Sequence, residues 1–255
     1  MNTKPTAIIL SDELTWPSVV LDCLNKHRDI FYLGKAILAG IEEGPFPTNY
    51  DNAHEELYKA LLPFPLKGYH CTKLTESEIL NIANNGMNLP DLDLLTRRID
   101  ALVSCGTLTS EIANKLKTKN QANDQKRAGR LYFCFYPPKK AGNGVESFFR
   151  LWGGEALYGH HEKDLETGEV LRNIGRPCII EADIPVSFLS QHYELTDRTV
   201  NNFLKNRGCA TNNYCDLVAC STKNISSSQI KKIFQFPDPD FIELSGCNDW
   251  DESLI

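Results

Sequence analysis

The sequence has no long apolar run, no paired cysteine motif and no surplus of positive charge. No segment approaches the roughly 20 consecutive apolar residues that a membrane-spanning helix needs, so we expect no membrane partner. The net charge of −6 at pH 7 excludes a chain that binds nucleic acid over its whole surface. The first residues, Met1 to Pro5, lack the apolar core and the cleavage site of a secretion signal, which predicts a cytoplasmic location.

The nine cysteines are scattered singly, and the sequence shows no Cys/His spacing of a zinc motif. Cys134, Cys178 and Cys220 lie in apolar stretches and are predicted to be reduced core residues. His160 and His161 are adjacent, and neighbouring side chains on an extended chain point to opposite sides. We therefore predict an exposed loop there and no metal site.

The 255 residues fit one large domain or one domain with a substantial appendage, and the hydrophobic fraction of 42% is enough to fill a core. We predict an α+β fold with an N-terminal helical region over residues 1–65 and a mixed domain over residues 66–255. The helical region contains three segments with apolar residues at helical spacing, which lie at Thr15–Leu24, Phe31–Ile41 and Ala53–Leu62.

The strongest strand of the mixed domain is the aromatic run Leu131–Tyr136, which two prolines close and which we expect to be central. Further strands are predicted at Tyr69–Cys71, Glu155–Tyr158, Pro177–Pro185, Cys215–Cys220 and Lys232–Phe236. Helices are predicted from Thr75 to Gly86, over Leu92–Leu102, from Thr109 onward, over Val145–Trp152 and over Thr196–Arg207. The segment Pro237–Asp240 is predicted to be a surface tail.

The mixed domain begins with a strand that leads directly into a helix. Thr75 stands three residues before Glu78, the spacing at which a capping hydroxyl and a carboxylate of the first turn satisfy each other's backbone donors. Gly86 is placed to end this helix. His70 and Thr72 should therefore project from a strand end beside a helix whose position is fixed.

This block resembles the first motif of the diphtheria-toxin and poly(ADP-ribose)-polymerase-like ADP-ribosyltransferases. In that motif a strand carrying His-x-Ser/Thr is followed by a helix and a glycine. His70, Thr72 and Gly86 occupy those places, and Cys71 stands where the family usually has glycine. The run Gly129-Arg130-Leu131-Tyr132-Phe133 is similar to the second motif, Gly-x-x-Tyr-Phe.

The third motif of the family is a carboxylate on a late strand. Asp216-Leu217-Val218-Ala219, followed by an isoleucine-rich stretch, resembles it with Asp in place of Glu. Glu155, directly after Gly153 and Gly154, is a competing carboxylate. The resemblance covers roughly residues 66–237 and implies an ADP-ribosyltransferase-like split β-sheet core with an N-terminal helical cover.

The resemblance implies an NAD-dependent enzyme that transfers ADP-ribose to a protein or a nucleic acid, as a toxin or a defence effector. A protein acceptor would be positioned by the loop Arg207–Tyr214, next to the late carboxylate. It implies that His70 and Thr72 orient NAD and that Tyr132 stacks on the nicotinamide ring. Ser147 and Phe148 would line the same pocket. Breaking the bond between nicotinamide and ribose builds positive charge on the sugar, so a fixed carboxylate, Asp216 or Glu155, would stabilise the transition state.

Other interpretations stay open. Water as the acceptor would make the protein an NAD glycohydrolase. A non-catalytic module that binds an NAD-like ligand or a partner is favoured by Cys71 and Asp216, which differ from the usual residues of the family. A cysteine hydrolase that uses Cys71 or Cys215 with His192 has little support, because no glycine-rich oxyanion element accompanies either cysteine.

The same residues also have ordinary structural interpretations. Tyr132 in an aromatic strand is by default a core residue, and Asp216 is then a charge at a strand edge. Glu155 can cap a turn or pair with Arg150. The basic stretch Lys115–Arg130 is more often a solvated helix end and loop than a nucleic-acid contact.

Overall fold

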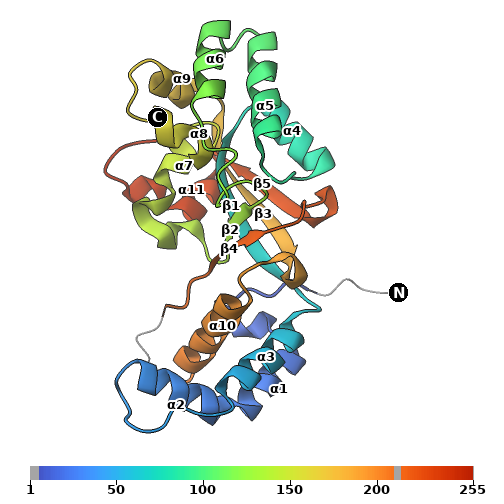
Figure 1. Ribbon diagram of the computed structural model, residues 1–255, viewed down its shortest axis with the longest axis vertical. Helices are drawn as coiled ribbons and strands as arrows, with labels where there is room; N and C mark the ends of the chain where they lie inside the picture. The colour runs from blue at the N-terminus through green and yellow to red at the C-terminus, as the bar shows by residue number, and fades with distance from the viewer. Residues whose placement is uncertain (1–5, 210–213, 255) are drawn as a thin grey trace. The chain divides into compact units, whose positions relative to one another are not determined.

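The computed structural model describes residues 6–209 and 214–254 and shows an α+β fold (Figure 1). The chain divides into two compact units. The first contains residues 1–68, 134–136 and 183–220, and the second contains residues 69–133, 137–182 and 221–255. The expected N-terminal region, residues 1–65, therefore lies inside a unit that also takes in a later helix of the chain.

The first unit is built around four helices: α1 (Ser18–Lys26), α2 (Arg28–Leu38), α3 (Tyr50–Leu61) and α10 (His192–Asn206) (Figure 1). Helix α3 packs against each of the other three. Phe31 and Leu57 are fully buried in its core. A buried ion pair between Lys35 and Asp197 also joins α2 to α10. The four helices that the apolar spacing predicts here are confirmed, with ends shifted by a few residues.

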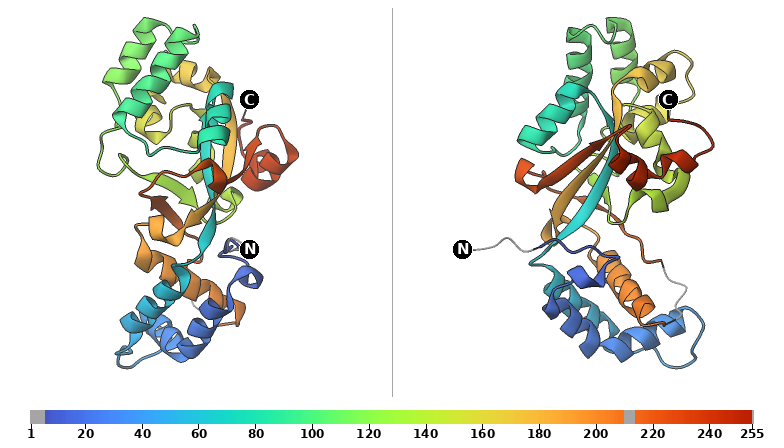
Figure 2. Two further views of the ribbon diagram at one scale, coloured as in Figure 1. Left: turned by 90° about the vertical axis from the view of Figure 1, so that its right-hand side faces the viewer. Right: turned by 180° about the vertical axis from the view of Figure 1, so that it is seen from behind.

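A five-stranded sheet has the strand order β4-β2-β1-β3-β5. Its strands are β1 (Pro65–Leu74), β2 (Leu131–Cys134), β3 (Arg176–Pro185), β4 (Val218–Ser221) and β5 (Ile230–Gln235). The long strands β1 and β3 are neighbours (Figure 2). Strands β3 and β5 are antiparallel, with Cys178 opposite Gln235 and a register shift between Glu181 and Ala182. Strand β1 is the middle strand of the sheet, and the aromatic strand β2 is an interior strand between β4 and β1, as the sequence predicts.

The second unit surrounds its strands with short helices. They are α4 (Glu76–Asn85), α5 (Leu92–Ser104), α6 (Ser110–Thr118), α7 (Glu146–Arg150), α8 (Glu155–His161), α9 (Thr167–Asn173) and α11 (Pro239–Ser245). Helices α5 and α6 lie side by side (Figure 1). Two apolar clusters hold the unit together, one around Ile99 and Trp152 and the other around Phe149 and Phe241.

Three expectations about local structure are wrong. Residues 155–158 form the start of helix α8, because Leu157 and Tyr158 pack into the apolar cluster around Ile99 and Trp152. His161 is 2% exposed at the end of that helix and does not lie in an exposed loop. The segment Pro237–Asp240 is exposed as predicted, but it is not a tail, because Pro239 begins helix α11, in which Phe241 is buried. Each error follows from packing that the local sequence does not contain.

Strand limits also differ from expectation. The predicted short strand Tyr69–Cys71 is the middle of the ten-residue β1, and the predicted strand Cys215–Cys220 begins only at Val218. Within residues 6–209 and 214–254, no helix combines the length and hydropathy that a membrane crossing needs.

Candidate functional site

The junction of β1 and α4 has the local structure that the sequence predicts. The Thr75 hydroxyl accepts a hydrogen bond from the Glu78 amide at 3.3 Å, and the Glu78 carboxylate accepts one from the Thr75 amide at 2.8 Å. Gly86 ends α4 with φ of 82°, and a Cβ there would lie 2.0 Å from the Ile225 carbonyl oxygen. Only glycine fits this position.

Glu78 ties this junction to its surroundings. Its carboxylate accepts hydrogen bonds from the Trp152 indole at 3.0 Å and from the Arg98 guanidinium at 2.5 Å. Burial is the largest single influence on the pKa of Glu78 and raises it. The Arg98 charge and the hydrogen bonds together outweigh burial, so the pKa is lowered. The end of β1 is therefore held by a charged anchor as well as by a helix cap.

His70 and Thr72 lie two residues apart on β1 and so share one face of the strand. His70 is half-buried and Thr72 is buried. Neither residue projects from the strand end as expected, because β1 continues to Leu74. The strand instead holds His70 against the neighbouring strand β2.

The His70 imidazole has a fixed orientation. Its Nδ1 donates a hydrogen bond to the Tyr132 carbonyl oxygen at 2.8 Å, since a carbonyl can only accept. Within the part of the chain that the structure describes, Nε2 has no hydrogen-bond partner. Burial lowers the pKa of His70, the nearby Arg98 charge lowers it further, and the hydrogen bond to Tyr132 opposes both. The ring is therefore neutral at pH 7, with Nε2 as a hydrogen-bond acceptor.

Tyr132 is not a core residue. Its neighbours Leu131 and Phe133 are buried, whereas Tyr132 is 40% exposed, because alternate side chains of a strand point to opposite faces. Its hydroxyl donates a hydrogen bond to the Lys126 carbonyl oxygen at 3.0 Å. The phenol ring is thus held at its tip while part of its surface stays open to solvent.

Glu155 is linked to Tyr132 through two adjacent residues. Arg127 pairs with the Glu155 carboxylate at 2.8 Å. The backbone carbonyl of Lys126, the residue before it, accepts the hydrogen bond from the Tyr132 hydroxyl. Arg150, the partner that the sequence suggested for Glu155, instead pairs with Glu146. Glu155 occupies the first turn of α8, where a negative charge is favoured.

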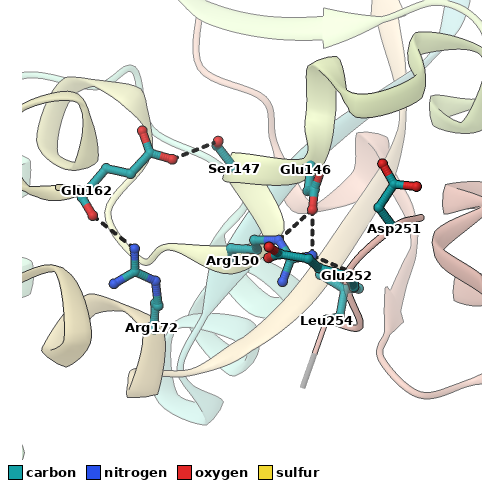
Figure 3. A pocket seen from close by; sticks show the side chains of 8 residues that line it. All are labelled: Glu146, Ser147, Arg150, Glu162, Arg172, Asp251, Glu252 and Leu254. Atoms are coloured by element: carbon teal, nitrogen blue, oxygen red, sulfur yellow. Dashed lines mark hydrogen bonds and ion pairs between the residues drawn. The ribbon is translucent and has the colours of Figure 1, made fainter.

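Ser147 and Phe148 lie on α7 but in different surroundings. Ser147 borders a cavity of about 510 Å³ and donates a hydrogen bond to Glu162 at 3.3 Å (Figure 3). Phe148 packs edge-on against Tyr158. The cavity lining carries four carboxylates and two guanidinium groups and includes neither His70 nor Tyr132; its residues are Glu146, Ser147, Arg150, Glu162, Arg172, Asp251, Glu252 and Leu254. A role for Ser147 and Phe148 in NAD binding stays a prediction.

Asp216 belongs to the first unit. It is exposed and lies two residues before β4, and not on the strand as expected. The neighbouring Leu217 carbonyl accepts a hydrogen bond from the Phe135 amide at 2.9 Å. Residues 210–213 of the loop Arg207–Tyr214, which the sequence suggests as an acceptor-positioning loop, lie outside the described residues.

Three of the basic side chains in the stretch Lys115–Arg130 are held in ion pairs. Lys115 pairs with Glu166 at 2.7 Å, Lys117 pairs with Asp100, and Arg127 pairs with Glu155. These contacts agree with a solvated helix end and loop. Each pair reduces the positive charge that this stretch offers to a phosphate backbone.

Three features of the second unit were not found from the sequence. Arg98 acts on His70 by its charge and anchors Glu78, and the loop residues Lys126 and Arg127 connect Tyr132 to Glu155. Lys73, three residues after His70 on β1, is buried, and desolvation lowers its pKa to about 8. Its ammonium group donates to the backbone carbonyls of Arg150 and Arg172. Residues of this kind act through contacts far along the chain, so no local motif reveals them.

The fold places His70 and Tyr132 in contact and links Tyr132 to Glu155 through one loop. Searches against protein-family models, curated proteins and solved structures find no match to this chain in any of the three.

Proposed function

We propose that the protein is an NAD-dependent ADP-ribosyltransferase that cleaves the bond between nicotinamide and ribose. The observation that carries the proposal is the contact between His70 and Tyr132, two residues 62 positions apart that the sequence motifs pair and that the sheet brings together. If the two motifs belong to one family site, the fold should bring His70 and Tyr132 together. Two motifs that match by chance give no reason to expect this contact.

His70 suits the binding of a ribose hydroxyl. Its Nδ1 is committed to the Tyr132 carbonyl, so the neutral ring offers Nε2 as an acceptor of fixed direction. A hydroxyl donor on the ribose matches this acceptor. Because the strand and the backbone carbonyl hold the ring, little conformational entropy is lost when substrate binds.

Tyr132 suits stacking on a flat ring. Its phenol is partly exposed and its hydroxyl is tied to Lys126, so the ring is presented in one orientation. A flat aromatic ligand gains apolar contact and favourable ring stacking against such a side chain. Tyr132 therefore holds the nicotinamide in the proposed complex.

The proposed reaction breaks the glycosidic bond between the ribose C1′ and the nicotinamide nitrogen. Nicotinamide leaves as a neutral molecule with the bonding electron pair. The acceptor nucleophile then bonds to C1′ and loses a proton. A carboxylate stabilises the positive charge on the ribose during this step, and the sequence offers Asp216 and Glu155 for that task. With Glu155 paired to Arg127, its charge would act on the ribose only if that ion pair opens.

The test is the release of free nicotinamide from NAD by the purified full chain, followed by mass spectrometry. Wild type is compared with His70→Ala and with His160→Ala, an exposed histidine on α8 as the matched control. Release by wild type and His160→Ala but not by His70→Ala supports the proposal. Equal release by all three proteins would contradict it.

The absence of release by wild type is resolved by a second measurement. Because a transferase can need its acceptor, the same proteins are examined by thermal shift with NAD. Stabilisation of wild type and loss of that stabilisation in His70→Ala would keep the NAD site and favour either a missing acceptor or a non-catalytic NAD-binding module. No stabilisation of wild type would reject NAD as the ligand.

A further inference from the structure

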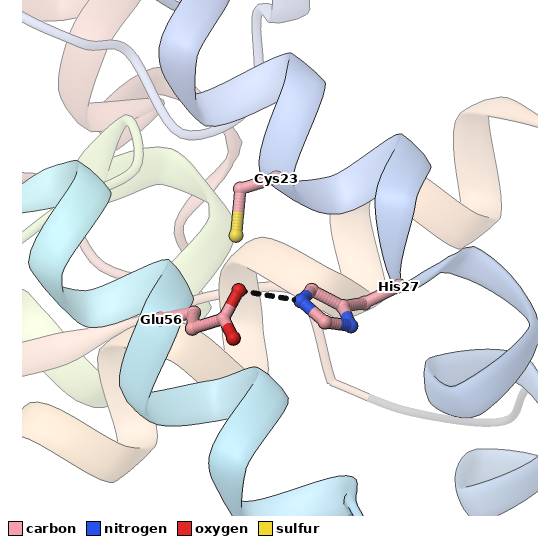
Figure 4. Close-up of side chains that lie close together, drawn as sticks. All are labelled: Cys23, His27 and Glu56. Carbon is pink, nitrogen blue, oxygen red and sulfur yellow. Dashed lines mark hydrogen bonds and ion pairs between the residues drawn. The ribbon is translucent and has the colours of Figure 1, made fainter.

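We propose that Cys23, His27 and Glu56 form a binding site for a Zn²⁺ ion in the first unit (Figure 4). This site is separate from the proposed NAD chemistry, which lies at His70 and Tyr132. No sequence motif indicates it.

The three side chains converge from two helices. Cys23 lies on α1, and His27 ends that helix four residues later, so both side chains occupy one face. Glu56 comes from α3, which packs against α1. One ligand atom from each residue lies within 4.8 Å of the other two. In Figure 4 the thiol lies above the carboxylate and the imidazole lies to its right.

This arrangement fits the coordination of Zn²⁺ with small adjustments. Zinc binds sulfur, nitrogen and oxygen ligands at about 2.0 to 2.3 Å in a tetrahedron, so ligand atoms lie roughly 3 to 4 Å apart. The His27 Nε2 and a Glu56 carboxylate oxygen are 2.8 Å apart and need to separate slightly. The Glu56 side chain is 47% exposed, so it has room to rotate and solvent can supply the fourth ligand.

The mixture of ligands selects the metal. A thiolate and an imidazole favour Zn²⁺ over Mg²⁺ and Ca²⁺, which prefer oxygen ligands. A glutamate carboxylate is ionised at neutral pH, so Glu56 enters the site as an anion. A cysteine thiol is mostly protonated at neutral pH. Binding therefore releases the thiol proton to solvent as the sulfur–zinc bond forms.

Lys26 is the group that competes with the ion. Its ammonium lies 2.7 Å from the same Glu56 oxygen that faces His27. The Lys26 side chain is 63% exposed, so it can swing into solvent when the ion enters. The contact also shows that this carboxylate already attracts a cation. Removing Lys26 should therefore strengthen zinc binding.

The experiment is a titration of the metal-free full chain with Zn²⁺ by calorimetry, and with Co²⁺ by absorption spectroscopy. A thiolate bound to Co²⁺ produces a charge-transfer band in the near ultraviolet, which reports whether a cysteine is a ligand. We expect one equivalent to bind to wild type with this band. Cys23→Ser should lose the band, and His27→Gln and Glu56→Gln should bind more weakly. Loss of a direct ligand should reduce affinity by more than about a hundredfold, beyond the usual effect of losing an outer-shell partner.

Two control variants separate this site from adventitious binding. Cys105→Ser removes an exposed cysteine outside the cluster and should leave the stoichiometry and the band unchanged. Lys26→Met removes the competing ammonium and should raise the affinity about tenfold or more, since a cation next to the site opposes the ion. Far-ultraviolet circular dichroism of each variant verifies that it is folded.

Three results would overturn the proposal. The first is the absence of one-equivalent binding to wild type. The second is an unchanged cobalt band in folded Cys23→Ser. The third is equal zinc affinity in wild type and in both folded His27→Gln and folded Glu56→Gln. If Cys23→Ser fails to fold, the His27 and Glu56 variants decide the question through affinity.

Discussion

Two histidines of the second unit, His70 and His161, show how the hydrogen bonds of an imidazole ring decide its role. Burial lowers the pKa of both. His161 has partners at both ring nitrogens, the Thr167 hydroxyl at 2.9 Å and the Lys119 carbonyl at 2.7 Å. His70 has one partner, the Tyr132 carbonyl, among the described residues. A histidine bonded at both nitrogens holds a structure together, whereas one bonded at a single nitrogen is oriented and can still accept a ligand.

The largest expected effect is the loss of NAD turnover when His70 or its partner Tyr132 is replaced. His70→Ala and Tyr132→Ala should each reduce nicotinamide release by more than about a thousandfold, because substrate loses its hydroxyl acceptor or its stacking surface. The thermal transition should change little, since Tyr132 is 40% exposed and His70 makes one hydrogen bond to the backbone. Release kinetics and calorimetric melting measure the two effects. A large loss of stability in both variants would make the pair a structural contact.

The reverse pattern is expected for His161. His161→Ala should destabilise the protein by about 3 kcal/mol, because the change leaves a cavity and two unpaired groups at a site that is 2% exposed. Urea denaturation measures the free energy of unfolding, and His160→Ala on the same helix is the exposed control. A loss below about 1 kcal/mol in the free energy of unfolding would show that His161 stabilises the fold no more than His70 does.

Variants of the two candidate carboxylates, Asp216 and Glu155, test which of them stabilises the transition state. Asp216→Ala should reduce nicotinamide release by about a hundredfold, more than Glu155→Ala, whose charge is already paired with Arg127. Release rates under saturating NAD give the ranking. The opposite ranking would assign the catalytic carboxylate to the start of α8.

His54, a buried histidine of the first unit, allows a test by pH of how burial disfavours the charged imidazole. Burial lowers the pKa of His54 from 6.5 to about 4, with Asp197 raising it and Lys35 lowering it further. The unfolded state therefore binds more protons between these values, and stability is present above pH 6.5 and lost as pH falls toward 4. We expect a loss of about 2 kcal/mol from this residue between pH 7 and pH 5.

Urea denaturation at pH 7 and pH 5 measures the pH effect, with His54→Gln as the variant that cannot titrate. The difference in free energy of unfolding between the two pH values should be smaller in His54→Gln by that amount. Identical pH dependence in the two proteins would show that His54 is not the source.

The smallest expected effect belongs to the Tyr132 hydroxyl. Tyr132→Phe keeps the ring and removes only the hydrogen bond to Lys126. We expect turnover to fall by no more than about tenfold, because one hydrogen bond contributes about 1 kcal/mol. Steady-state release measures it beside Tyr132→Ala. Equal losses in the two variants would shift the role of Tyr132 from its ring to its hydroxyl.

Features that depend on neighbours in the sequence were predicted from the sequence. The cap of Thr75 and Glu78, the helix end at Gly86 and the strand over residues 177–185 are all present in the structure. A helix cap needs only residues three positions apart, and a buried strand needs only an apolar run between turns. The α+β class follows from such local signals as well.

Features that depend on distant contacts were decided by the tertiary structure. The chain buries His161 and makes residues 155–158 helical because α8 packs its apolar side chains into a core that the local sequence does not contain. Tyr132 is exposed because its strand has one buried face. Cys23 and His27 show helical spacing in the sequence, but Glu56, 29 residues after His27, joins them only because α3 packs on α1.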